Sequence, residues 1–82
     1  MAERRTDERR RVVKAGKIVW NKGASILDCT VRNVSKTGAM VEVSAALTVP
    51  EEFELRWNNN VERRRCIVVW RKLDRVSVKF EP

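Results

Sequence analysis

The sequence predicts an all-β protein: a small six-stranded antiparallel β-barrel with a flexible basic amino-terminal arm. Three observations predict this class. Apolar and β-branched residues recur at period two, no 11-residue window shows a convincing helical stripe, and turn-forming residues separate the apolar segments. A chain of 82 residues has room for one small domain. We therefore expect residues 1–11 to form the arm and residues 12–82 to form the barrel.

Alternation of apolar and polar residues indicates the first three strands. The first strand is expected from about Val13 to Trp20, followed by a turn at residues 21–23. The second is expected from about Ser25 to Asn33. A turn at residues 35–38 then leads into a third strand over residues 39–44, which hairpins back on the second.

The second half of the chain continues the pattern after a loop at residues 45–51, which contains Pro50. Closure into a barrel is expected because it pairs the strand edges and encloses the apolar face, whereas an open sheet of this size would expose both. The three remaining strands are expected at residues 52–57, 61–72 and 75–80, with turns at residues 58–60 and 73–74.

The charge balance favours an anionic partner. Eighteen lysines and arginines against eleven acidic residues give a net charge of +7. The basic excess is concentrated in residues 1–11 and 61–75. In the second region, Arg63, Arg64 and Arg65 are interpreted as a solvated strand face.

Composition also disfavours several classes of function. The chain has no histidine, and Cys29 and Cys66 lack metal-ligand spacing, so we expect no zinc site and interpret both cysteines as buried apolar residues. Without a histidine base or a glycine-rich phosphate loop, an enzyme is not expected. The sequence shows neither a long apolar run nor a secretory signal, which predicts a cytoplasmic protein.

Two short motifs carry the functional interpretation. Arg5 and Arg9 frame an RxxxR segment, and the stretch from Asn33 to Gly38 reads NxSxxG. Alone, the first is typical of a solvated tail and the second of ordinary turn chemistry. Two arginines four residues apart in an extended arm are up to ~13 Å apart, and each planar fork can bind phosphate or a guanine edge. Together the motifs indicate a site for an anionic nucleotide.

With these motifs in this order on a barrel-like strand pattern, the chain resembles a PilZ domain, the bacterial receptor module for the second messenger cyclic di-GMP. The resemblance implies a set of ligand-binding residues. In it, Asn33 offers an amide, Ser35 a hydroxyl, and Gly38 a position that tolerates positive φ and close approach of the ligand. The implied set is Arg5, Arg9, Asn33, Ser35 and Gly38.

Two further residues extend that set by resemblance. Arg4 matches members that bind the ligand as an intercalated dimer, so one ligand or two stacked ligands are both open. Trp70 is a candidate to stack on a guanine, although Trp20, Trp57 and Trp70 are all plausible core residues.

The expected function is a cyclic di-GMP effector, a nucleotide-binding signalling module without a cofactor. Its arm would close over the ligand, and the closed form would signal to a separate protein partner. Two alternatives are kept: a small basic barrel that binds RNA or single-stranded DNA, and a ligand-free PilZ-like adaptor. The sequence leaves the downstream pathway and the oligomeric state open.

Overall fold

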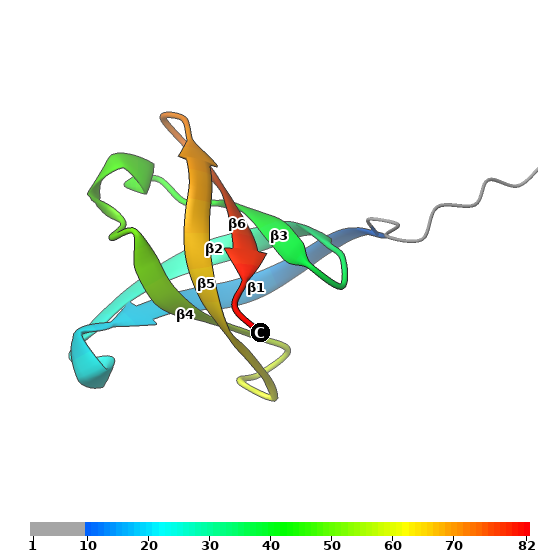
Figure 1. The fold of residues 1–82 in the computed structure, drawn as a ribbon, viewed down its shortest axis with the longest axis horizontal. Coiled ribbons are helices and arrows are strands. Elements are labelled where there is room, and N and C mark those ends of the chain that lie inside the picture. The colour runs from blue at the N-terminus through cyan, green and yellow to red at the C-terminus, as the bar shows by residue number, and fades with distance from the viewer. Residues whose placement is uncertain (1–9) are drawn as a thin grey trace, which may run out of the picture.

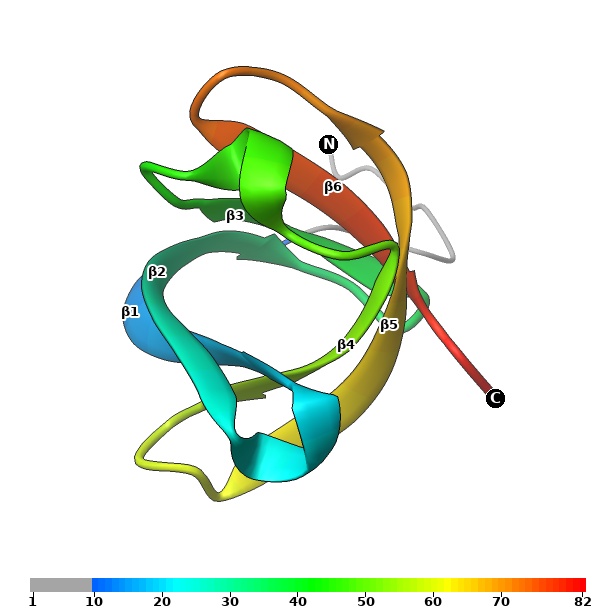
Figure 2. The same ribbon diagram turned by 90° about the vertical axis from the view of Figure 1, so that its left-hand side faces the viewer.

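The structure, a computed structural model, describes residues 10–82, which form a closed antiparallel β-barrel (Figures 1 and 2). The strand order around the barrel is β1-β2-β3-β6-β5-β4, and β4 closes it by pairing with β1. The predicted all-β, six-stranded barrel is therefore confirmed. The strands are β1 (Arg10–Trp20), β2 (Ser25–Val34), β3 (Gly38–Glu42), β4 (Glu52–Trp57), β5 (Glu62–Arg71) and β6 (Arg75–Phe80).

The connections follow the predicted turn positions, with one addition. The loop before β4 contains a short 3-10 turn, η2 (Ala46–Thr48), which the sequence pattern did not indicate. A second 3-10 turn, η1 (Asn21–Gly23), joins β1 to β2. Neither of these helical turns, the two found in residues 10–82, is long and apolar enough to cross a membrane.

The turn between β4 and β5 consists of three asparagines in the left-handed region. Their φ angles are 60°, 58° and 68° for Asn58, Asn59 and Asn60. Among residues with a side chain, asparagine is one of the few that visit this region routinely. The run of three therefore reverses the chain within a few residues, as the sequence predicted.

The core fills the barrel with inward-facing side chains that alternate along the strands. Phe53 and Leu55 on β4, Ile18 on β1 and Val41 on β3 are fully buried. At one end, Trp57 stacks on Phe80 with ring centroids 6.2 Å apart and an interplanar angle of 15°. This alternation is the pattern from which the strands were predicted.

The three tryptophans have different environments. Trp57 is 9% exposed and belongs to the core, and Trp20 is partly buried against it. Trp70 is 41% exposed. The structure thus separates three residues that the sequence left as plausible core residues.

β1 begins at Arg10, earlier than the predicted start at Val13. Arg10 and Arg11 are in register with Val34 and Asn33 of β2, so strand pairing continues to the end of β2. Tertiary pairing extends the strand beyond the segment in which the apolar alternation is visible.

Candidate functional site

The NxSxxG segment forms the tight turn between β2 and β3, held together by Ser35. The Ser35 hydroxyl accepts hydrogen bonds from the backbone N–H groups of Thr37 and Gly38, both at 3.2 Å. The Ser35 N–H donates to the Gly38 carbonyl at 2.8 Å. Ser35 is only 9% exposed. Its oxygen therefore fixes the shape of the turn from within.

Gly38 is required by close packing against β6. A Cβ added at Gly38 would lie 2.3 Å from the carbonyl oxygen of Val78, well inside any real contact. Gly38 does not use its tolerance of positive φ, because among the described residues Gly23 is the glycine with that conformation. The close approach of the β3 and β6 backbones explains why residue 38 is a glycine.

A lateral row of register partners connects Asn33 with Trp70. Asn33 on β2 pairs with Met40 on β3, Met40 pairs with Ser77 on β6, and Ser77 pairs with Trp70 on β5. On the other side, Asn33 pairs with Arg11 of β1. Directly opposed residues of antiparallel strands project to the same face of a sheet. Asn33, Met40, Ser77 and Trp70 therefore share one face.

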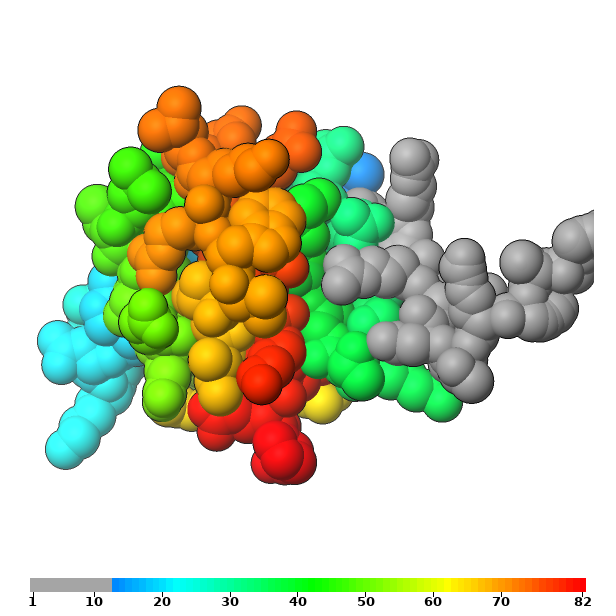
Figure 3. Space-filling model, turned by 45° about the horizontal axis from the view of Figure 1, so that its top comes forward, coloured from blue at the N-terminus to red at the C-terminus, as the bar shows by residue number. Residues whose placement is uncertain are grey.

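That face is the outside of the barrel. On β6, Ser77 lies between Val76 and Val78, which are 0% and 2% exposed and belong to the core. Successive side chains on a strand alternate between faces, so Ser77 and its row lie on the outer face, where Ser77 itself is covered and 8% exposed. Figure 3 shows part of this outer surface, where atoms of β5, β6 and β3 meet.

Two β-bulges turn Asn33 and Trp70 outward. The ladder shifts register between Val31 and Asn33 in β2, and between Val68 and Trp70 in β5. Val31 is fully buried, and Val68 packs against the core. Strict alternation from these two valines would point Asn33 and Trp70 into the barrel. One extra residue in each strand reverses that direction.

Basic side chains surround the row. The Lys72 ammonium lies 5.6 Å from the centre of the Trp70 ring. Lys79, which is exposed, is in register with Gly38 on one side and Ile67 on the other. Arg32, the bulged residue before Asn33, lies 3.7 Å from a carboxylate oxygen of Glu42. An aromatic ring, an amide and several cations are thus gathered on one outer surface, which suits a ligand with bases and phosphates.

The predicted arm residues Arg4, Arg5 and Arg9 lie outside the described residues. The structure places the strand that follows them: β1 starts at Arg10, the next residue after Arg9, and runs beside the end of β2. Met40 and Ser77 were missed by the sequence interpretation. Their place in the row depends on how β3 and β6 pair, and no local pattern reports that pairing.

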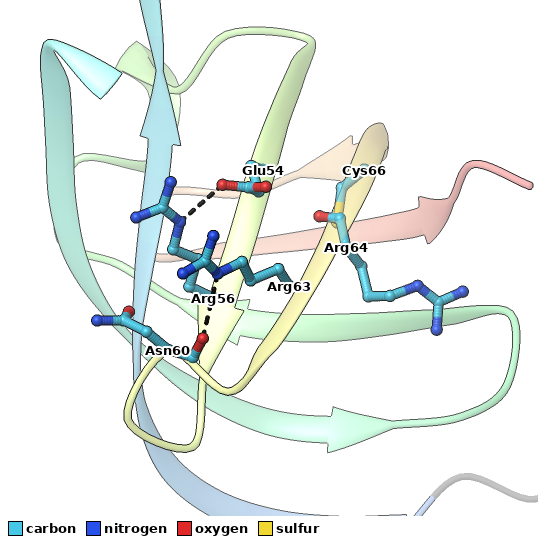
Figure 4. Close-up of polar contacts among 6 residues, drawn as sticks. All are labelled: Glu54, Arg56, Asn60, Arg63, Arg64 and Cys66. Carbon is cyan, nitrogen blue, oxygen red and sulfur yellow. Dashed lines mark hydrogen bonds and ion pairs between the residues drawn. The ribbon is translucent and has the colours of Figure 1, made fainter. Parts of the chain in front are cut away.

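The second basic region, which contains Arg63 and Arg64 of β5, places these two arginines away from the row and beside Arg56 of β4 (Figure 4). Arg56 pairs with Glu54 at 2.6 Å, and Arg63 donates a hydrogen bond to the Asn60 carbonyl at 3.2 Å. The Arg64 guanidinium lies 4.3 Å from the centre of the Phe80 ring and covers the end of the core. These arginines make intramolecular contacts and do not join the row that contains Asn33 and Trp70.

Both cysteines are buried thiols. Burial, with a smaller contribution from the neighbouring Asp28 carboxylate, raises the pKa of Cys29 to about 12. Burial also raises the pKa of Cys66 to about 12, against a smaller opposite effect from a backbone hydrogen bond at Leu55. Thiols this far from ionisation are poor nucleophiles and metal ligands at neutral pH. Among residues 10–82 there is no cluster of three or more metal-ligating side chains.

A closed barrel with a polar turn and an exposed tryptophan on its outer face defines a small β-barrel binding domain. The family model of the PilZ domain matches residues 3–82, nearly the whole chain. The chain therefore belongs to the PilZ domain family, a family of receptor domains for cyclic di-GMP and not of catalytic domains. No curated protein matches the chain.

Proposed function

We propose that this protein binds cyclic di-GMP on the outer face of the barrel and reports the bound state to a separate protein in the bacterial cytoplasm. The row from Arg11 to Trp70 carries the proposal. It puts an amide from the NxSxxG turn and an exposed tryptophan on one surface. It also places the start of β1, directly after the RxxxR segment, beside that surface.

Each part of the site has a distinct role in this proposal. Arg5 and Arg9, with Arg4, bind phosphates or guanine edges from the arm. Asn33 hydrogen-bonds a base edge from the fixed side, and Trp70 stacks on a guanine. Ser35 and Gly38 contribute by shaping the turn that presents Asn33. The ligand selects the closed arm because it contacts arm and barrel together only in that state.

Calorimetry with cyclic di-GMP tests the proposal directly. We expect saturable binding with a dissociation constant in the micromolar range or below. Arg5→Ala or Arg9→Ala should weaken it by ~1–3 kcal/mol, or roughly 5- to 150-fold, since each removes charge-assisted hydrogen bonds. Arg63→Ala is the matched control, because that arginine lies away from the row. The fitted stoichiometry distinguishes one bound ligand from an intercalated pair.

The two alternatives give different results in the same experiment. A nucleic-acid barrel would bind a single-stranded oligonucleotide with steep salt dependence and would tolerate Asn33→Ala. The structure disfavours that alternative, because single-strand platforms use successive exposed aromatic rings and Trp57 is buried here. A ligand-free adaptor would show no heat with cyclic di-GMP at millimolar concentration, and that result would overturn the proposal.

A further inference from the structure

The longest strand of the barrel is paired on both sides for only part of its length. β1 pairs with β2 along most of its course, but β4 pairs with β1 only from Gly16 to Val19. After Trp57 the chain leaves β1 through the asparagine turn and enters β5. Among the described residues, the β1 segment from Arg10 to Ala15 thus pairs on its β2 side alone, with a register shift between Arg11 and Lys14 (Figure 1).

This unpaired edge is open to solvent where its side chains are described. Val13 is 73% exposed, and Lys14 and Ala15 are exposed as well. In an antiparallel strand, successive backbone N–H and C=O groups point alternately to the two sides. Outside the register shift between Arg11 and Lys14, about half of those in this segment therefore face the side on which no described strand pairs with them. Such an edge is a template for one more strand.

A cavity adjoins the point where the free edge ends. It has a volume of about 500 Å³, and Ala15 and Gly16 of β1 line it. Its lining also includes the buried Trp57 and Cys29 and the exposed Asn59 of the turn. A volume of this size admits a large side chain. Trp57 and Cys29 offer it apolar contacts, while Lys17, Asp28 and Arg56 add charged groups to the lining.

The charges along this edge favour an acidic partner. The sequence of the edge contains Arg10, Arg11 and Lys14 without an acidic residue. Where the cavity begins, Lys17 and Arg56 are register partners across β1 and β4, a like-charge pair. Asp28 and Glu54 offset these two, at 2.5 Å and 2.6 Å, which leaves the edge itself with the basic excess.

We propose that the free edge of β1 docks an extended acidic segment of a partner protein. The segment adds as a strand beside residues 10–15 and places one apolar side chain in the adjoining cavity. Main-chain hydrogen bonds supply affinity, and the cavity and basic residues supply specificity. This edge adjoins the ligand row at Arg11, the register partner of Asn33, and docking at it does not require cyclic di-GMP.

Other occupants fit the edge less well. A second copy of the chain would bring two sets of Arg10, Arg11 and Lys14 to one ladder, and like charges repel there. A nucleic acid has no backbone that continues a β-ladder. The acidic segment alone satisfies both the hydrogen-bonding edge and the charge.

Two synthetic ten-residue peptides test the proposal against the full chain labelled with ¹⁵N, without cyclic di-GMP. One alternates glutamate and valine with a central leucine, and the other has lysine for every glutamate. The acidic peptide should cause saturable amide shifts from Val13 to Lys17. It should also slow exchange of the edge amides in that stretch at least tenfold.

Charge reversal supplies the matched comparison. Lys14→Glu should weaken binding of the acidic peptide at least tenfold and should favour the lysine peptide. Lys22→Glu makes the same change in the exposed η1 turn at the other end of β1 and should change the binding of neither peptide. The proposal is overturned if no shift saturates, or if shifts appear without slower exchange. It also fails if dilution alone shifts these amides, or if an oligonucleotide reproduces the effect.

Discussion

The carbonyl oxygen of Val78 occupies the space where a side chain at residue 38 would begin. A Cβ on Gly38 would be 2.3 Å from that oxygen and 3.2 Å from the Cα of Lys79. Both atoms belong to the β6 backbone, which cannot move without disturbing its pairing with β3 and β5. The last residue of the NxSxxG motif is therefore a packing requirement of the barrel.

Gly38→Ala should destabilise the fold by about 1–3 kcal/mol, the usual cost of overpacking a tight site. Urea unfolding followed by tryptophan fluorescence measures this change. Gly23→Ala is the control for loss of glycine freedom, because Gly23 has φ of 90° but nothing within 4 Å of the added Cβ. An unchanged urea midpoint in Gly38→Ala would contradict the packing explanation.

Trp70 and Trp57 should respond to alanine substitution in opposite ways. Trp57→Ala removes a buried ring from the core and should cost about 3–5 kcal/mol of stability. Trp70→Ala should change stability by about 0.5 kcal/mol or less, because the ring lies on the outer surface. If Trp70 stacks on the ligand, its loss should weaken binding of cyclic di-GMP by about 1–3 kcal/mol. Calorimetric titration and urea unfolding of both variants separate the effects.

Arg71 ties the η2 turn to the end of β5. Its guanidinium Nη1 donates to the carbonyl oxygens of Ala46 and Val49, at 3.2 Å and 2.5 Å. Arg71→Ala leaves two carbonyls without this donor and should cost about 1.5–3 kcal/mol. Arg75→Ala is the matched control, because its 3.9 Å pair with Asp74 is solvent-exposed and should matter by under about 1 kcal/mol. If thermal unfolding shows the same loss of stability in the two variants, Arg71 does not have this role.

The buried thiols should make the protein lose stability in alkaline solution. The pKa values of Cys29 and Cys66 are raised from 9.0 to about 12, so the unfolded chain releases these protons at lower pH than the folded one. Stability from this source is complete below pH 9 and falls between about pH 9 and 12. Urea midpoints measured across that range should fall less steeply in Cys29→Ala than in the parent. Parallel curves would argue against the raised pKa of Cys29.

The sequence correctly predicted the features that depend on local chemistry. Alternating apolar residues such as Phe53, Leu55 and Trp57 indicate strands with one buried face, wherever the neighbouring strand lies. The three-asparagine run marks a reversal because asparagine tolerates left-handed φ. The motif from Asn33 to Gly38 indicated the PilZ family by residue type and spacing, and the family match confirms that family.

Tertiary structure decided which face each of those residues presents. If side chains alternated strictly from the buried Val31 and the partly buried Val68, Asn33 and Trp70 would point into the core. A bulge in β2 and another in β5 turn them outward into one row with Met40 and Ser77. A bulge arises from the fit between two strands distant in sequence, so no window of either strand contains it. The residue types of the candidate site can thus be read from the sequence, but their common surface depends on the pairing of β2, β3, β6 and β5 and on the two bulges.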